Sequence, residues 1–207
     1  MAILTIDPQH THYPAALQTY IDTPLPLTIH SDHRGEAGFA WLQDDTASAQ
    51  TPIIAFFSSA KISGSLLLRV HELAQSWRSQ PLTIISGFQS PAEAEVWSVL
   101  FSDIADRRTP IREQSSPRLV KVLARGMVKR LKANEHLALA NGYLQLISPF
   151  PITTSRVTKE TSWQRNLVAA ALADRILIAN AEPDSQTMAL AEHVERWGKP
   201  VVHLGGT

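Results

Sequence analysis

The sequence predicts an α/β fold in which an open parallel β-sheet carries helices on both faces. From Thr51 onward, short apolar runs rich in β-branched residues alternate with longer segments of helical periodicity. Of the 207 residues, 44% are hydrophobic and 18% are charged, which suffices for one buried core. The chain has no cysteine, so disulfides, thiol catalysis and cysteine-ligated zinc are excluded.

Residues 1–50 differ from this pattern and are predicted to form an N-terminal extension packed on the core. Tyr13–Tyr20 predicts a short helix, Leu25–Ile29 a short strand and Asp44–Thr51 a polar connector. The segment is too short to bury much core of its own. Residues 51–207 are therefore predicted to be the main domain.

Six apolar runs predict the strands: Pro52–Ser58, Leu82–Ser86, Leu119–Ala124, Tyr143–Ile147, Arg175–Ala179 and Pro200–Leu204. Four segments of helical spacing lie between them: Ser63–Trp77, Pro91–Leu100, Thr161–Leu172 and Gln186–Trp197. Ser90, Pro91 and Glu93 predict a capped helix start, with serine as the N-cap and glutamate completing a capping box. Asp103–Pro117 is rich in Arg, Ser and Pro and is predicted to be a loop.

The charge is neutral in total but unevenly distributed. Residues 1–50 hold one basic and six acidic side chains, whereas residues 106–135 hold nine basic and three acidic ones. A basic segment in a neutral chain can form an anion-binding face. Its lysines and arginines are candidates for nucleic-acid electrostatics: Arg107, Arg108, Arg112, Arg118, Lys121, Arg125, Lys129, Arg130 and Lys132. We expect the salt dependence of anion binding to be lost preferentially when residues 107–132 are neutralised.

Neither a targeting segment nor a membrane span is predicted. The N-terminus lacks a basic region followed by a long apolar run, and the longest uncharged stretch, His136–Ser155, contains two prolines and several polar residues. We therefore expect a cytoplasmic protein.

Ligands of open α/β sheets bind beyond the carboxyl ends of the strands, where helix N-termini attract phosphate. The candidate ligand residues at these ends are Ser58, Ser59, Ser86, Gly87, Phe88, Gln89, Ser90, Arg125, Gly126, Ser148, Ser185, Gln186 and Thr187. Neither a dinucleotide-binding glycine motif nor a P-loop is present in the sequence.

Several of these segments, taken in order, resemble the DNA-processing protein A (Smf) family. The segments are His12–Leu17 (HYPAAL), Ser86–Pro91 (SGFQSP), Ala124–Gly126 (ARG), Ser148–Phe150 (SPF) and Arg156–Asn166, followed by the ALAD strand and its loop. The resemblance covers nearly the whole chain and extends to the larger group of Rossmann-like SLOG domains that includes the cytokinin-activating LOG proteins. It implies a Rossmann-like domain that binds single-stranded DNA or a nucleotide in the strand-end groove, often as a homodimer.

Carried over by residue, Ser59 stands where the family has Gly-Ser-Arg, and Ser86-Gly87 match its Ser-Gly-Gly turn. Arg165-Asn166 match its Arg-Asn pair, and Arg156 and Thr158 belong to the same segment. The chain departs from the pattern at Ala60, which replaces an arginine, and at Phe88-Gln89. It also departs at Asp184, which stands in the loop that cradles phosphate in LOG-like phosphoribohydrolases. These departures indicate a divergent member.

Three functions remain open from the sequence. The first is a non-catalytic protein that binds single-stranded DNA or a nucleotide-derived ligand, in DNA processing, recombination or defence and with a protein partner. The second is a nucleotide hydrolase, either a LOG-like phosphoribohydrolase or an N-glycosidic-bond enzyme, with Glu93 as its acid/base. The third is a sensor of a nucleotide signal. No cofactor is predicted beyond a bound nucleotide.

Aromatic residues and histidine pairs are two further groups of candidate site residues. Phe88, Phe150 and Trp163 are candidate surfaces for base stacking. The pairs His10/His12 and His30/His33 have metal-compatible spacing but lack a third ligand in pattern, so we expect them on the surface and no metal site.

Overall fold

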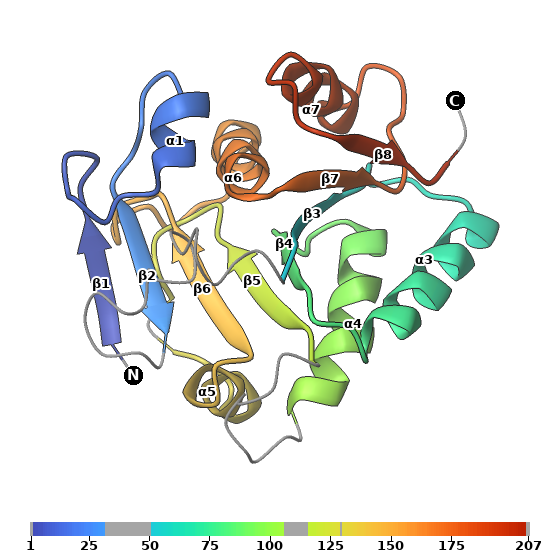
Figure 1. The fold of residues 1–207 in the computed structure, drawn as a ribbon, viewed down its shortest axis with the longest axis horizontal. Helices are drawn as coiled ribbons and strands as arrows, with labels where there is room; N and C mark the ends of the chain where they lie inside the picture. Colours follow the sequence, from blue (N-terminus) through green and yellow to red (C-terminus); the bar gives the residue numbers. More distant parts are fainter. Residues whose placement is uncertain (1, 32–50, 106–115, 129, 206–207) are drawn as a thin grey trace.

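The computed structural model describes residues 2–31, 51–105, 116–128 and 130–205. Its centre is one eight-stranded sheet with the order β1-β2-β6-β5-β4-β3-β7-β8. Figure 1 shows this sheet crossing the molecule from β1 at one edge to β8 at the other. The α/β prediction is confirmed.

The strands are β1 (Ala2–Ile6), β2 (Leu27–Ser31), β3 (Ile53–Phe57), β4 (Thr83–Ser86), β5 (Arg118–Val122), β6 (Leu144–Ser148), β7 (Arg175–Ile178) and β8 (Val201–His203). The six strands from β6 to β8 in the sheet order are parallel. Helices cover both faces of these strands, so every residue of β4 and β6 is buried, including the polar residues Thr83, Ser86, Gln145 and Ser148. All six predicted strands are present, shifted by one or two residues at their ends.

The helices are α1 (Ala15–Tyr20), α3 (Gly64–Trp77), α4 (Pro91–Ala105), α5 (Ala133–Ala140), α6 (Lys159–Leu172) and α7 (Gln186–Glu195). The sequence did not predict α5. It also predicted a loop from Asp103, whereas α4 continues to Ala105 because Phe101 and Ile104 are buried against the sheet. Residues 106–115 of that predicted loop lie outside the described part of the chain.

The helices form two layers, one on each face of the sheet, as Figure 1 shows. Val120 and Val122 of β5 contribute to the core under α1, α6 and α7. Leu119 and Leu123 contribute to the core under α3, α4 and α5. This alternation follows from the two-residue period of a strand, so the predicted helices on both faces are confirmed.

The amino-terminal segment extends the sheet. β1 pairs antiparallel with β2, and β2 pairs antiparallel with β6, where Ile29 lies opposite Ile147. β1 was not predicted from the sequence. Tyr13 and Leu17 are buried beside these strands, and the Tyr13 hydroxyl donates to the Leu25 carbonyl at 2.7 Å. Whether residues 1–50 are best considered an extension stays a prediction, because residues 32–50 lie outside the described chain.

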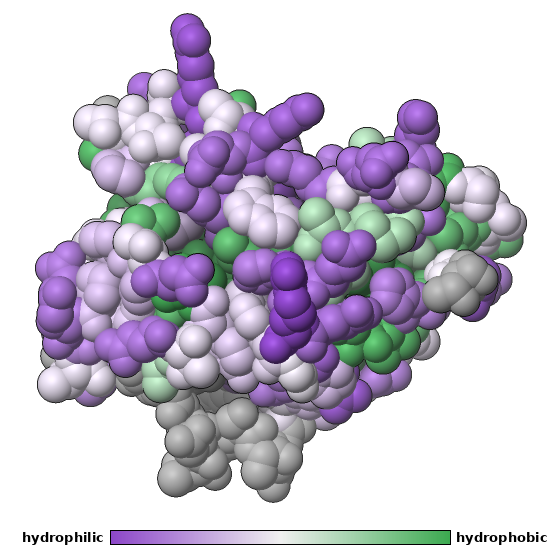
Figure 2. All heavy atoms as spheres, turned by 90° about the horizontal axis from the view of Figure 1, so that it is seen from above, coloured by the Kyte–Doolittle hydropathy of each residue, from purple (hydrophilic) through white to green (hydrophobic). Residues whose placement is uncertain are grey.

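The outer surface is largely polar. Figure 2 looks onto the molecule from above and shows hydrophilic side chains over most of that face, with smaller hydrophobic areas between them. Among the described residues, the helices are all too short or too polar to cross a bilayer.

Candidate ligand-binding site

A cavity of about 510 Å³ lies at the carboxyl ends of β4 and β5, where the sequence predicted a ligand site. Five of its lining residues are basic: Lys121, Arg125, Arg130, Lys132 and Arg165. Among the residues that the structure describes, Glu135 is the one acidic residue of the lining. The remaining walls are Gly87, Gln89 and a set of apolar side chains that comprises Val122, Leu123, Ala124, Val128, Leu131, Leu146 and Val157.

Arg165 is the most buried cation of this cavity. It is only 5% exposed, although α6 presents it at the cavity wall. Among the described residues, its Nε atom has no hydrogen-bond partner. Burial lowers the pKa of the Arg165 guanidinium and the nearby Glu93 carboxylate opposes that shift, so the group remains protonated. A buried cation with unused hydrogen-bonding capacity favours an anionic ligand.

The guanidinium of Arg165 packs directly against Gly87. A Cβ atom built on Gly87 would overlap Nη1 and Cζ of Arg165 and would lie 2.8 Å from its Nε. The side chain of any other residue would therefore occupy the space of the guanidinium. The glycine after β4 thus allows the Arg165 guanidinium to pack closely against the backbone, in addition to the tight turn that the sequence indicated.

Glu93 ties two strand-end loops together. Its carboxylate is 5% exposed and accepts hydrogen bonds from the Gln89 N–H at 2.9 Å and the Ser58 N–H at 3.3 Å. The predicted N-cap is present, since Ser90 Oγ accepts from the Glu93 N–H at 3.3 Å, but the predicted capping box is not, because the Glu93 carboxylate accepts from the Gln89 and Ser58 N–H groups in place of the Ser90 N–H. Glu93 therefore positions the loops after β3 and β4 beneath Arg165.

Lys121 faces the cavity from β5 and has an aromatic support. Its ammonium lies 4.5 Å from the ring centroid of Trp97, which is stacked on Phe101. Burial lowers the pKa of Lys121, and Arg125 and Lys132 act in the same direction, whereas Glu135 raises it. Several cations within one partly dry cavity repel one another, so an anion that enters should be bound more strongly than at an isolated lysine.

The loop after β5 forms a further wall and is held by backbone contacts. A Cβ atom on Gly126 would overlap the Pro151 carbonyl oxygen, and the Gly126 N–H donates to the Thr154 carbonyl at 2.8 Å. Ser148 Oγ donates to the Arg125 carbonyl at 2.7 Å. Gly126 and Ser148 thus fix the backbone that presents Arg125, and neither lines the cavity.

A separate polar cluster lies where β3 and β7 end. Ser59 Oγ donates to Ser185 Oγ and accepts from the Glu182 N–H, each at 3.0 Å, and Ser185 caps α7. Asp184 has a positive φ of 58°. The ends of β3 and β7 are therefore joined to each other, and these serines do not line the basic cavity.

The structure brings together only part of the predicted site. Gly87, Gln89, Lys121, Arg125, Arg130, Lys132 and Arg165 line the cavity. The other described candidates lie outside the lining: Ser58, Ser59, Ser86, Phe88, Ser90, Glu93, Arg118, Gly126, Ser148, Arg156, Thr158, Asn166, Ser185, Gln186 and Thr187. Arg107, Arg108, Arg112 and Lys129 lie outside the described residues.

The candidate residues that do not line the cavity occupy other positions in the fold. Arg118 begins β5 and so lies at the strand end opposite the cavity. Thr158 caps α6, and Arg156 is exposed in the loop before it. Asn166 has a buried Oδ1 that has no partner among the described residues, and Ser86 Oγ accepts from the Phe88 N–H.

The aromatic candidates offer little surface to a base at this site. Phe88 and Phe150 are each only 7% exposed. Trp163 lies in α6 on the wall of a different cavity, which also contains Tyr13 and His193. Apolar contacts in the basic cavity come instead from aliphatic residues such as Leu123 and Leu146, which the sequence did not indicate because they lie in or beside strands as ordinary core residues.

The expectation of surface histidines is wrong for His30. This residue lies in β2, is 8% exposed and faces the α5 side of the sheet, where burial and His136 lower its pKa. Among the described residues, there is no group of three potential metal-ligating side chains. His33 falls outside them.

Taken together, the fold and the site define a Rossmann-like α/β protein with a basic cavity at the strand ends. Among solved structures, the chain is similar to DNA processing protein A from Streptococcus pneumoniae, with a TM-score of 0.71 and 18% identity over 99% of this chain and 64% of that one. It is also similar to DNA processing protein A from Helicobacter pylori, with a TM-score of 0.65 and 15% identity over 97% of this chain and 80% of that one.

These similarities confirm the fold predicted by the resemblance. The chain spans less than two thirds of the length of the pneumococcal protein. No protein-family model matches the sequence, and no curated protein matches it.

Proposed function

We propose that this chain binds single-stranded DNA, or the phosphate of a nucleotide-derived ligand, in the basic cavity at the strand ends. The observation that carries the proposal is Arg165, a buried guanidinium whose Nε lacks a partner among the described residues and which lies at the wall of a cavity with four further cations. Arginine in such a place suits a phosphate, because its planar fork of donors matches phosphate oxygens.

The structural neighbours support a single strand as the ligand. The Helicobacter pylori protein of the same fold is described by its single-stranded DNA binding mode. The cavity here also has aliphatic walls beside its cations, and a single strand exposes both phosphates and bases to such a surface. A duplex would present mainly its phosphates to the cavity.

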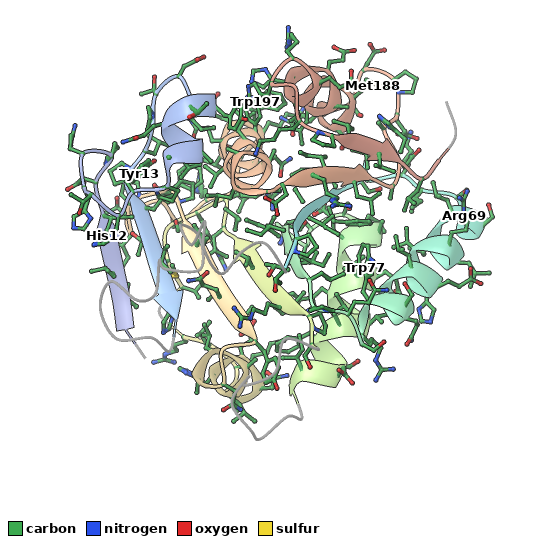
Figure 3. All side chains as sticks on the ribbon, viewed as in Figure 1. His12, Tyr13, Arg69, Trp77, Met188 and Trp197 are labelled. Atoms are coloured by element: carbon green, nitrogen blue, oxygen red, sulfur yellow. The ribbon has the colours of Figure 1, made fainter. Side chains whose placement is uncertain are left out.

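Fluorescence anisotropy with a labelled oligothymidylate tests the proposal. We expect salt-sensitive binding that is strongest near about 50 mM salt and is weakened by the change Arg165→Met, which keeps an apolar side chain of similar length. Arg69→Met is the matched control, because Arg69 is exposed on α3, at the right-hand edge of the molecule in Figure 3, and does not line the cavity. Absence of salt-sensitive binding at low salt would contradict the proposal.

A nucleotide is the second candidate ligand. The cavity volume of about 510 Å³ falls in the range typical of small-molecule sites. A thermal-shift screen against nucleoside mono- and diphosphates distinguishes the two, since saturating ligand at about a hundredfold its Kd stabilises the fold by about 2.7 kcal/mol. A nucleotide that stabilises the chain in the absence of oligonucleotide binding would favour the sensor.

A hydrolase function depends on Glu93. Its carboxylate already accepts two backbone N–H groups, which favours a positioning role over proton transfer. Release of free base or ribose phosphate from a nucleotide, lost in Glu93→Gln, would support catalysis. A homodimer, a partner in DNA processing or defence and a cytoplasmic location stay predictions.

A further inference from the structure

A second cavity, of about 280 Å³, lies between α1, the loop that follows it, α6 and α7. Tyr13, Leu17, Tyr20, Ile21, Asp22, Thr23 and Leu25 form one wall, Glu160, Trp163, Gln164, Leu167 and Val168 form the other, and His193 lies at the α7 end. We call this set of residues the α1–α6 groove. In Figure 3 the labelled Tyr13 and Trp197 mark the two sides of this region above the sheet.

The groove and the basic cavity use different sides of the same helix. Glu160, Trp163, Gln164 and Leu167 are spaced three, one and three residues apart, which places them on one stripe of α6. Arg165 follows Trp163 by two positions, which is about 200° around a helix with 3.6 residues per turn. Arg165 lines the basic cavity and not the groove, although Val168, three residues further on, lines the groove.

The groove has an aromatic and aliphatic lining with held side chains. Tyr20 is stacked on Trp197 with ring centroids 5.0 Å apart, and His193 contacts the edges or faces of both Trp163 and Trp197 at 5.7 and 5.1 Å. Aromatic rings that are fixed in this way need little further ordering when a partner binds.

The charged residues of the groove are acidic. Asp22 and Glu160 are both exposed, and no lysine or arginine is present among the lining residues of the described chain. The ammonium of Lys199 lies 4.5 Å from the Tyr20 ring centroid and is bound by the carbonyls of Ala170, Ala171 and Ala173 at the end of α6. The neighbouring aromatic surface thus already accepts one cation over a ring face.

We propose that the α1–α6 groove is a docking site for a partner protein that inserts an arginine or lysine flanked by apolar residues. Asp22 and Glu160 would pair with the cation, and Trp163 and Leu167 would contact its aliphatic stem and its neighbours. The two carboxylates disfavour phosphate and so distinguish this site from the basic cavity. The volume is below the range typical of small-molecule pockets but accommodates one or two inserted side chains, and arginine in an aromatic setting is a frequent interface hot spot.

Selection from a phage-displayed dodecapeptide library on the whole chain tests this inference, with counter-selection on the variant Asp22→Lys/Glu160→Lys. We expect the retained peptides to carry Arg or Lys beside apolar residues. Replacing the basic residue of the best peptide by neutral citrulline should weaken its binding at least about tenfold. The unchanged peptide should bind the double variant more weakly by a similar factor. Glu72→Lys is the control for a changed net charge, because Glu72 is exposed on α3 away from the groove.

The inference is overturned if no peptide survives counter-selection, or if the retained peptides lack basic residues. It is also overturned if citrulline and the double variant leave the affinity unchanged, or if Glu72→Lys weakens binding equally. Circular dichroism should show that Asp22→Lys/Glu160→Lys remains folded, since both side chains are exposed; were it unfolded, Asp22→Asn/Glu160→Gln would replace it in the same measurement. An oligonucleotide that competes with the peptide would assign the groove to nucleic acid instead.

Discussion

Replacing Gly87 by alanine should weaken oligonucleotide binding without unfolding the chain. The backbone of Gly87 has an ordinary φ, so alanine is allowed there, and the obstacle is the guanidinium of Arg165, whose Nη1 and Cζ the new Cβ would overlap. Arg165 must therefore leave its present position against Gly87. The change tests whether the position of this cation, and not merely its charge, determines binding.

The expected size follows from the hydrogen bond between Arg165 and the ligand that this displacement removes. A hydrogen bond to a charged group contributes about 1.5–3 kcal/mol. One factor of ten in Kd corresponds to about 1.4 kcal/mol, so Gly87→Ala should raise the Kd for oligothymidylate about ten- to a hundredfold. The free energy of unfolding should change by less than about 1 kcal/mol, because alanine reduces the entropy of the unfolded chain while the displaced guanidinium regains water.

Fluorescence anisotropy gives the Kd, and urea denaturation gives the free energy of unfolding. A double-mutant cycle with Arg165→Met separates the two residues: in that background Gly87→Ala should have little further effect on affinity. Wild-type affinity in Gly87→Ala, or an equal loss in both backgrounds, would refute the reasoning that Gly87 acts through Arg165.

Three more perturbations test the charges of the cavity and the packing of the amino-terminal segment. Affinity for oligothymidylate should fall as the pH rises through the lowered pKa of Lys121, because the anion binds the protonated lysine. The fall should occur at a lower pH than for an ordinary lysine, and Lys121→Arg should remove it. Arg125→Glu/Lys132→Glu should lower the slope of log Kd against log salt by about 0.7 for each phosphate that is no longer neutralised, whereas Arg69→Glu should leave it unchanged. Burial raises the pKa of Tyr13 to about 12, above its value in the unfolded chain. The contribution of Tyr13 to stability is therefore complete below about pH 10 and is lost toward pH 12. Tyr13→Phe should lower the free energy of unfolding by about 1–2 kcal/mol at neutral pH, measured by urea titration, and should remove this alkaline dependence.

Much of the fold could be predicted because its signals are local. The parallel strands are short, mainly apolar runs between turn residues, and both of their faces are buried, as in Thr83–Ser86. β1 and α5 escaped prediction for local reasons too. β1 is a five-residue edge strand, AILTI, with no turn signal ahead of it, and α5 is an eight-residue helix whose buried positions are only Ala138 and Leu139.

The site was predictable in outline and not in membership. The position of the carboxyl strand ends follows from the order of elements, and it correctly brought Gly87, Arg125 and Arg165 to one place. The sequence could not show that Ser59 and Ser185 bond to each other instead of lining the cavity. It also could not show that Arg118 lies at the opposite end of the strand from Arg125.

The sequence by itself therefore determined the class of fold, the edge of the sheet at which the candidate cavity lies and the basic character of the central segment, since each depends on composition or on short-range periodicity. Tertiary structure alone decided which cations share a cavity and that the Arg165 guanidinium packs against Gly87. It also separated Trp163 from Arg165, two neighbours in the chain that α6 turns toward different cavities. The physical reason is that burial and electrostatic coupling depend on distances between elements far apart in the sequence, which local patterns do not contain.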